Sequence, residues 1–442
     1  MAAVIAPEVG SQQGPSRPSK SSEVPLLPTH LVVLINGILS SAQDWKYAKE
    51  ELSKRLGKNV YVYASMSNSW FNTLHGIDVA GRRLAEEIRG VVRSHPSLVR
   101  ISFVAHSLGG LIARYAVSVL YTSLPPHHPV LIASKAAQSN GSPPKTAQTN
   151  GSSREIAQTN GSQPEVQFSS GSPPEIAESN GSLPNREKLS RPVELPTIAG
   201  LEPVAFVTLA SPHLGVRGNK QLPFLLGLKP LETLAAPIAP LVVGRTGRQL
   251  FLTDGNSRRP PLLLKMSRDC REGPFVSSLR CFQLRVLYAN AGYDHMVGWR
   301  TSCIRREREL PKLPSRPVDK RYRHVVSIEN CPEVPLASAS VLDAPSSAGP
   351  MGAGEINFRQ WRGIGDTHDL LEEEMVAGLQ QVAWRRVDVS FTGALFPFMA
   401  HHSIQVKHKV LHWEGAGVIA HLADTLRSLE EGHAAVFLEA KL

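Results

Sequence analysis

The sequence predicts an α/β fold, in which helices cover both faces of a mainly parallel central sheet. Short runs such as residues 30–35 (HLVVLI) are continuously apolar and rich in β-branched residues, as is typical of strands buried on both faces. Longer helical patterns alternate with these runs, which favours a parallel sheet. The chain has 442 residues and is 42% hydrophobic, so it is long and apolar enough to bury a large core.

The predicted elements alternate between strand and helix. In the first part of the chain, strands are expected over residues 30–35, 59–65 and 100–105, and helices over 42–56, 76–92 and 108–121. The last of these helices is apolar almost all round, as expected of a helix covered on both sides. In the second part, strands are expected over residues 202–210, 282–289, 385–391 and 404–406, and helices over 367–384 and 416–429.

Low-complexity stretches interrupt this pattern. Residues 1–28 are rich in Pro, Ser and Gly and predict a disordered N-terminal arm. Within residues 124–196 a ten-residue unit repeats, and its copies carry almost no bulky apolar residue that could bury a core. We therefore expect this insertion to lie outside the fold, and residues 332–360 to form a second flexible loop. The remaining chain is predicted as one domain over 29–430 with a tail over 431–442.

The net charge of +10 is concentrated in one segment. Residues 245–323 contain 18 Lys and Arg against 7 Asp and Glu. Such a segment is either a solvated basic face or a contact site for an anionic membrane surface. It carries no nucleic-acid-binding motif, so we expect no nucleic acid partner. No run of about 18 apolar residues predicts a transmembrane helix.

The four cysteines lack the C-x-x-C spacing of metal or redox sites. Without a secretion signal they are expected to be free thiols in a reducing compartment, which predicts a cytoplasmic protein. The Ser-rich, weakly basic N-terminus leaves a transit peptide to the chloroplast or another organelle as the alternative. No histidine cluster has the spacing of metal ligands, so we expect neither a metal nor an organic cofactor.

The stretch FVAHSLGG around Ser107 is typical of the sharp turn that presents a nucleophilic serine between a strand and a helix. The turn needs small residues two positions before and two positions after the serine, because strand and helix approach closely there. Ala105 replaces the usual glycine with one extra methyl group, and Gly109 keeps the second requirement. The alternative is a serine that only caps the helix, which leaves the small flanking residues unexplained.

A nucleophilic serine needs a base and an orienting acid, which follow it in the order acid and then histidine in this architecture. Asp294 lies just beyond a predicted strand, whereas Asp254 and Asp269 follow no such clear strand. His401 lies between a strand and the final helix, with His402 as its direct competitor. Other histidines fit the order or the strand position less well: His295, His324 and His368.

The negative oxygen of an acyl-transfer intermediate needs two backbone N–H donors. One is expected from Leu108, which directly follows the serine. The other is expected from Ile38, in the loop after the first core strand, where Gly37 lets the backbone approach closely.

Six blocks of the sequence, in the right order, resemble the "putative serine esterase" family of lipase-like α/β-hydrolases, which are common in plants. The resemblance covers about residues 29–122, 197–325 and 367–430, and the blocks are NGILSSAQDW, FVAHSLGGLIARYA, TLASPHLG, GRTGRQLFLTD, LYANAGYDHMVGWRTS and MAHHSIQVK. It implies an α/β-hydrolase fold, a triad carried to Ser107, Asp294 and His401, and hydrolysis of ester bonds in lipids. Many relatives have His-Gly where this chain has Asn36-Gly37, which leaves the role of the glycine intact.

The sequence as a whole thus predicts a serine hydrolase that cleaves carboxylic ester bonds of lipids through an acyl-enzyme on Ser107. An acyltransferase with the same triad and a non-catalytic binding protein of the same fold are the alternatives. Residues 215–252 are apolar and punctuated by Pro and Gly, and are predicted to form a cap over the active site. The expected partner is a lipid or ester substrate, and the sequence leaves the oligomeric state open.

Overall fold

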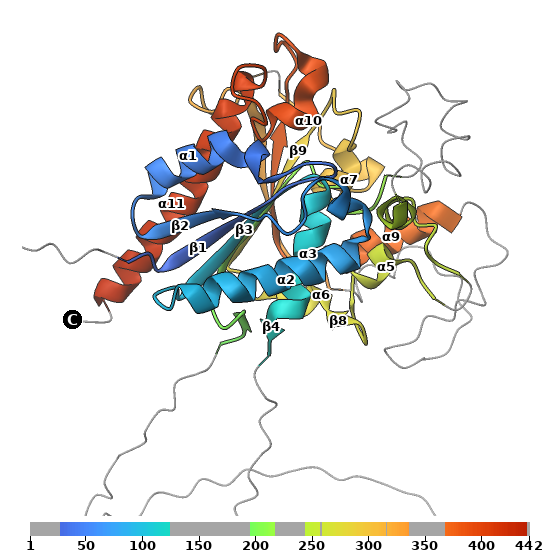
Figure 1. Ribbon diagram of the computed structural model, residues 1–442. Coiled ribbons are helices and arrows are strands. Elements are labelled where there is room, and N and C mark those ends of the chain that lie inside the picture. The colour runs from blue at the N-terminus through green and yellow to red at the C-terminus, as the bar shows by residue number, and fades with distance from the viewer. Residues whose placement is uncertain are drawn as a thin grey trace, which may run out of the picture. The chain divides into compact units, whose positions relative to one another are not determined.

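A computed structural model describes residues 27–123, 195–216, 244–256, 259–314, 316–335 and 367–439. Its centre is a seven-stranded sheet with the order β10-β11-β9-β6-β3-β1-β2. All neighbouring strands pair in parallel except β10, which pairs antiparallel with β11. With helices on both faces (Figure 1), this is the α/β-hydrolase fold that the sequence predicts.

The strands of the central sheet are β1 (His30–Ile35), β2 (Val60–Ala64), β3 (Arg100–His106), β6 (Glu202–Leu209), β9 (Leu284–Asn290), β10 (Val325–Cys331) and β11 (Trp384–Val389). Two small antiparallel pairs complete the strands, namely β4 (Tyr121–Thr122) with β5 (Thr197–Ile198), and β7 (Asp269–Cys270) with β8 (Gly273–Pro274).

The labelled α-helices are α1 (Lys46–Leu56), α2 (Ile77–Ser94), α3 (Leu108–Leu120), α5 (Leu262–Lys265), α6 (Phe275–Arg280), α7 (Trp299–Cys303), α9 (Thr367–Leu379), α10 (Ala400–Ser403) and α11 (Ala416–Glu439). Short 3-10 turns are η1 (Ala42–Trp45), η2 (Trp70–Leu74), η3 (Glu307–Glu309), η5 (Pro397–Met399) and η6 (Trp413–Gly415). Within the described residues, no helix is long and apolar enough to cross a membrane.

Each face of the sheet carries its own apolar core. Leu31, Val33 and Ile35 of β1 pack with residues of α2 and α3, whereas Val32 and Leu34 pack with residues of α1 and α11. Because side chains alternate along a strand, a continuously apolar strand such as β1 supplies both cores at once. This is why the central strands were predictable as unbroken apolar runs.

The chain reverses its direction across the sheet next to β1. From β1 it moves to β2 at the edge and then crosses back to β3 on the other side of β1. Loops after two such strands diverge at their carboxyl ends and leave a crevice in which α/β proteins bind ligands. The loop after β1 and the turn after β3 therefore meet at the place where a functional site is expected.

Most predicted elements are confirmed, with several corrections. The predicted strand over 404–406 is wrong, because these residues form a turn after α10. The helix predicted over 367–384 ends at Leu379, and Trp384 already begins β11. The final helix continues to Glu439, beyond its predicted end at residue 429. Strand β10 was not predicted from the sequence.

The predicted flexible segments lie largely outside the described residues. This holds for the N-terminal arm, for the repeat insertion and for most of the loop over 332–360. Of the predicted cap over 215–252, residues 217–243 are outside the described part, and residues 244–250 are helical. The two described flanks of the insertion meet, because Thr122 in β4 pairs with Thr197 in β5.

Candidate active site

Ser107 lies at the carboxyl end of β3, in a strained backbone conformation. Its φ of 54° and ψ of −130° fall in a region that side chains other than glycine rarely adopt. Its side chain makes no capping hydrogen bond to α3, although it occupies the position before the helix. The capping alternative therefore does not describe this serine.

The residues around Ser107 must be small because backbone segments approach closely. A Cβ added to Gly109 would lie 2.6 Å from the carbonyl oxygen of Ile35, and one added to Gly37 would lie 2.9 Å from the Cβ of Ser107. Ala105, two residues before the serine, is fully buried in β3. The methyl group in place of the usual glycine hydrogen is thus accommodated.

Three side chains that are far apart in the sequence meet at this turn. Nε2 of His401 lies 3.0 Å from Oγ of Ser107, and Nδ1 of His401 lies 3.0 Å from Oδ2 of Asp294. Because the carboxylate can only accept, Nδ1 carries the proton and Nε2 is free to accept one from the serine. Side chains of His401 and Asp294 are only 5% and 2% exposed, so little water competes for these bonds.

Asp294 is held by four hydrogen bonds. Besides His401, its oxygens accept hydrogen bonds from Asn290 Nδ2 at 2.8 Å and from the backbone N–H groups of Met296 and Val297 at 3.0 and 2.8 Å. Burial acts to raise the pKa of this carboxyl group, but His401 and the hydrogen-bond donors outweigh it and hold the pKa below its usual value. Asp294 is therefore a fixed carboxylate that orients the imidazole.

His106 forms a hydrogen bond to the backbone of His401. Its Nε2 donates to the backbone carbonyl oxygen of His401 at 2.7 Å, and the two rings lie 4.7 Å apart. Burial, reinforced by the nearby His401, lowers the pKa of His106 well below its usual value. His106 is thus a neutral hydrogen-bond donor that fixes the backbone of His401, the predicted base.

The loop after β1 faces the serine and is fixed at several points. Asn36 Nδ2 donates to the carbonyl oxygen of Asn68 at 2.8 Å, and the N–H of Leu39 donates to Thr73 Oγ1 at 3.0 Å. Leu108 is the first residue of α3, so its N–H has no acceptor within the helix. The backbone N–H groups of Ile38 and Leu108 make no hydrogen bond within the described part of the chain. These are the N–H groups that the sequence predicts as oxyanion donors, and that role stays a prediction.

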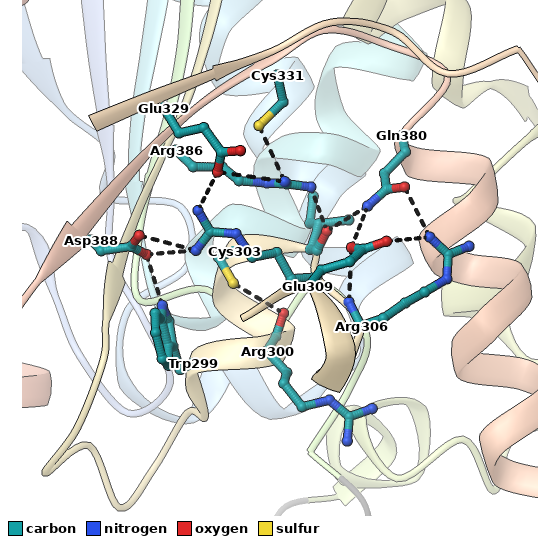
Figure 2. A network of polar contacts seen from close by, with 12 residues as sticks. Trp299, Arg300, Cys303, Arg306, Glu309, Glu329, Cys331, Gln380, Arg386 and Asp388 are labelled. Carbon is teal, nitrogen blue, oxygen red and sulfur yellow. Dashed lines mark hydrogen bonds and ion pairs between the residues drawn. The ribbon is translucent and has the colours of Figure 1, made fainter. Parts of the chain in front are cut away.

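The loop that carries Asp294 is anchored by a second polar cluster (Figure 2). It leads directly into α7, where Trp299 Nε1 donates to Asp388 Oδ1 at 2.7 Å. Arg305, just after α7, donates to both oxygens of Asp388 at 2.8 and 3.0 Å and to Glu329 at 2.7 Å. Arg305 and Asp388 are fully buried, so this cluster ties the acid loop to β10 and β11.

The rival candidates have other partners. Asp254 accepts a hydrogen bond from the N–H of Leu262, and Asp269 accepts from the N–H groups at the start of α6. The ring of His402 lies 5.6 Å from that of His401 and 5.7 Å from that of His412, but the hydrogen bonds to Asp294 and Ser107 are made by His401. The remaining candidates are equally occupied or remote: His324 donates to Ser390, His368 lies beside Asp369, and His295 is exposed.

Sequence reasoning missed two supporting residues. Asn290 binds Asp294 across one turn at the end of β9, and His106 binds the carbonyl of His401 although 295 residues separate them. The position of His106 next to the serine was the only local signal for its role. Among the described residues, no group of three or more His, Cys, Asp or Glu side chains could hold a metal ion.

Comparisons with known proteins point in the same direction. The sequence matches the family described as "Putative serine esterase" over residues 27–135 and 176–305, which is more than half of the chain. It is 26% identical over 285 residues to "Putative lipase C4A8.10" of Schizosaccharomyces pombe, covering 62% of this chain and 26% of that protein. It is 34% identical over 279 residues to "Putative lipase ROG1" of Saccharomyces cerevisiae, covering 62% and 28%. The chain thus spans less than a third of the length of these two relatives.

One solved structure matches over most of its length. It is the RedJ thioesterase from the prodiginine biosynthetic pathway in Streptomyces coelicolor, with 14% sequence identity and a TM-score of 0.25 over 66% of this chain and 84% of that chain. The fold assignment rests on the strand order and the connections of the chain itself.

Proposed function

Because this chain belongs to the "Putative serine esterase" family, we propose that it is a serine hydrolase that cleaves carboxylic ester bonds of lipids. The observation that carries the proposal is the continuous hydrogen-bond chain from Asp294 through His401 to Ser107, with 3.0 Å at each step. The strained backbone of Ser107 supports a nucleophilic role. The lipid class is supported by the names of the fungal relatives, which are putative lipases.

In the first half of the reaction, Ser107 Oγ attacks the ester carbonyl carbon while His401 Nε2 takes the hydroxyl proton. Asp294 keeps the imidazole in the required tautomer and stabilises its charged form. The N–H groups of Ile38 and Leu108 would bind the oxyanion of the tetrahedral intermediate. When the intermediate collapses, His401 gives its proton to the leaving alcohol and an acyl-enzyme remains.

In the second half, water attacks the acyl-enzyme. His401 takes a proton from the water, the oxyanion donors act again, and the carboxylic acid leaves as the proton returns to Ser107 Oγ. The net reaction consumes one ester and one water and forms one acid and one alcohol. No step needs a group beyond these side chains and backbone donors.

The central test is Ser107→Ala in the full-length protein, with p-nitrophenyl butyrate as substrate. We expect kcat/KM to fall by at least about 10³-fold, because no other hydroxyl lies at the end of the hydrogen-bond chain. Ser118→Ala is the matched control, because Ser118 lies on the same helix and its Oγ donates only to Tyr115. An equal rate for wild type and Ser107→Ala would show that the triad is wrong.

A second measurement separates the alternatives. A fluorophosphonate probe should label Ser107 in the wild type and leave Ser107→Ala unlabelled, whereas a non-catalytic binding protein would remain unlabelled in both forms. An alcohol acceptor added beside water distinguishes transfer from hydrolysis, because a transferase would convert the acyl-enzyme to a new ester. Lipid extracts compared by mass spectrometry, with wild type against Ser107→Ala, identify the natural acyl donor.

A further inference from the structure

Large apolar side chains are exposed on three loops around the candidate site. Their exposed fractions lie between 40% and 74%, which is unusual for side chains of this size. We call this set the apolar rim; it comprises Met66, Trp70, Phe71, Leu395, Phe396, Phe398, Val410, Leu411 and Trp413. An exposed group of this kind marks a surface that contacts another molecule.

Hydrogen bonds join the loops of the rim to one another and to the site. The N–H of Trp70 donates to the carbonyl oxygen of Ser40 at 2.8 Å, and Nζ of Lys407 lies 3.3 Å from Oγ of the same serine. The N–H of Leu395 donates to Glu414 at 2.9 Å, which ties the two later loops together. The rim thus flanks both the loop of Ile38 and the segment of His401.

The rim projects away from the sheet. Its two later loops precede and follow α10, and in Figure 1 the segment around α10 lies beyond the carboxyl ends of the sheet strands. Phe396 and Phe398 lie side by side, with ring centroids 6.1 Å apart. The site therefore opens on the same side of the molecule as the exposed aromatic and aliphatic groups.

The segments that carry the rim contain basic side chains but no acidic ones. Residues 65–77 and 390–413, which contain all of the rim, include no Asp and no Glu. Lys409 is exposed and forms no ion pair with the residues that the structure describes, whereas Lys407 pairs with Asp44 at 3.2 Å and Arg323 pairs with Glu414 at 3.7 Å. Burial lowers the pKa of His402 and of His412 to about 4, so the positive charge comes from Lys and Arg at neutral pH.

The basic segment over 245–323 is the weaker candidate for such a contact. Several of its cations bind carboxylates from other parts of the chain, including Arg245 with Asp78, Arg268 with Glu374, and Arg305 with Asp388. These pairs neutralise part of the positive charge that the sequence shows. The rim, in contrast, places the unpaired cation of Lys409 directly beside the exposed side chains of Val410 and Leu411.

We propose that the apolar rim docks on an anionic lipid bilayer and turns the candidate site toward it. Trp, Phe and Leu side chains enter the boundary between headgroups and acyl chains, while Lys and Arg attract anionic headgroups. Separate loop tips that combine these residue types fit a fluid bilayer, and the nearby Glu414 is buried and already accepts a hydrogen bond from Leu395. The docking does not depend on catalysis, so it can be tested with the Ser107→Ala protein.

The first test measures binding of full-length Ser107→Ala to vesicles of phosphatidylcholine with or without 30 mol% phosphatidylserine, by co-sedimentation. We expect binding to the phosphatidylserine vesicles, and a loss of at least about tenfold in affinity for Val410→Asp in the same background. Val99→Asp is the matched control, because Val99 is 56% exposed and precedes the amino end of β3, whereas the candidate site lies at its carboxyl end. Equal binding by both variants would overturn the proposal.

The second test concerns the charge. Lys409→Glu should weaken binding to the phosphatidylserine vesicles by about fivefold or more, because each Lys near such a surface contributes about 1 kcal/mol. Lys58→Glu, at the exposed turn before β2, should leave binding unchanged. If Lys58→Glu weakens binding as much, the attraction is a property of the net charge and not of the rim.

Failure of the docking proposal and failure of the triad are separate outcomes. With Ser107 intact, Val410→Asp should hydrolyse the water-soluble p-nitrophenyl butyrate at the wild-type rate. If Val410→Asp abolishes a dimer, seen by light scattering, while vesicle binding is unchanged, the rim is a protein interface and the bilayer proposal is wrong.

Discussion

At Ser107 the hydroxyl that is to react has a single hydrogen-bond partner, His401, whereas the buried cation of Arg305 has two carboxylate partners, Asp388 and Glu329. In the first cluster His106 is neutral and the serine backbone is strained. In the second, the fully buried Arg305 and Asp388 form a bidentate ion pair. Trp299 also donates to Asp388, and Glu329 also binds Arg305 (Figure 2).

The difference indicates what each cluster can do. A hydroxyl on a strained turn with one histidine partner can give up its proton at low cost, because few contacts must change. A buried ion pair with satisfied partners cannot change its protonation without leaving an uncompensated charge. We therefore expect substitutions in the first cluster to reduce the reaction rate and those in the second to reduce stability.

The largest effect is expected for Asp294→Asn. The amide cannot orient Nδ1–H of His401 as the carboxylate does, so kcat on p-nitrophenyl butyrate should fall by about 10⁴-fold. The amide oxygen can still accept from the backbone N–H groups of Met296 and Val297, although the bond from Asn290 is lost, so the thermal midpoint should fall far less than the rate. Asp254→Asn, which affects only the contact to Leu262, should keep the wild-type rate. A loss below tenfold for Asp294→Asn would contradict the assigned role.

Arg305→Met should have the largest effect on stability. It leaves the buried Asp388 without its cation, which costs about 3–5 kcal/mol in the free energy of unfolding. Urea unfolding at pH 7 measures the change. Replacing Asp388 by Leu in the same protein should restore much of the loss, because no uncompensated charge remains.

Arg321→Met is the control for this comparison. Arg321 pairs with Asp319 at the surface, so its loss should leave the unfolding curve unchanged. If the buried and the exposed arginine behave alike, the cluster around Asp388 does not stabilise the fold in the way described.

A smaller effect is expected at the tight contact behind the serine. In Gly109→Ala the new methyl group would lie 2.6 Å from the carbonyl oxygen of Ile35, so the free energy of unfolding should fall by about 1–3 kcal/mol. Gly90→Ala provides the opposite case, because the nearest atom to its new Cβ is 4.0 Å away. That variant should gain about 0.4–1 kcal/mol. Equal changes in both would show that the close approach at Gly109 is not constraining.

The smallest effect concerns pH and His106. The pKa of His106 is lowered in the folded protein, so below about pH 6.5 the unfolded chain binds a proton that the folded protein does not. The free energy of unfolding therefore decreases as the pH is lowered below this value. His106→Gln removes this loss. The destabilisation caused by the substitution should therefore shrink by about 1 kcal/mol between pH 7 and pH 5.5 in urea unfolding.

The matched reference for the pH experiment is Gly109→Ala, which removes no titrating group. Its effect on the free energy of unfolding should be constant over the same pH range. A His106→Gln effect that is equally constant would mean that this histidine binds a proton in the folded protein.

The central sheet was predictable because its strands are buried on both faces and appear as unbroken apolar runs. Strand β10 lacks such a run, since its last residues are exposed at the edge of the sheet. The predicted strand over 404–406 has an alternating pattern, yet these residues pack against the following turn at η6 and have no neighbouring strand to pair with among the described residues. Gly415 packs directly against the backbone of Ser403, and Val406 has a φ of 56°.

The candidate site was predictable from the order of its parts. A strand, a turn and a helix locate Ser107, and the carboxyl ends of later elements locate Asp294 and His401. Contacts that join distant segments leave no local pattern, which is why the bond from His106 to the carbonyl of His401 was missed. The cluster around Arg305 was missed for the same reason, because its members come from α7, β10 and β11.

The short β4–β5 pair makes the chain unusually open to engineering at one position. Thr122 and Thr197 are neighbours, so the segment between them starts and ends at one point of the domain. Each doubling in the length of such a connection costs only about 0.6 kcal/mol in closure entropy. The β4–β5 pair follows the C-terminal end of α3, whereas Ser107 precedes the N-terminal end of the same helix. The two positions are therefore separated by the length of α3. A fluorescent domain or affinity tag could therefore replace the segment without reaching the site, and would report on membrane docking from the opposite side.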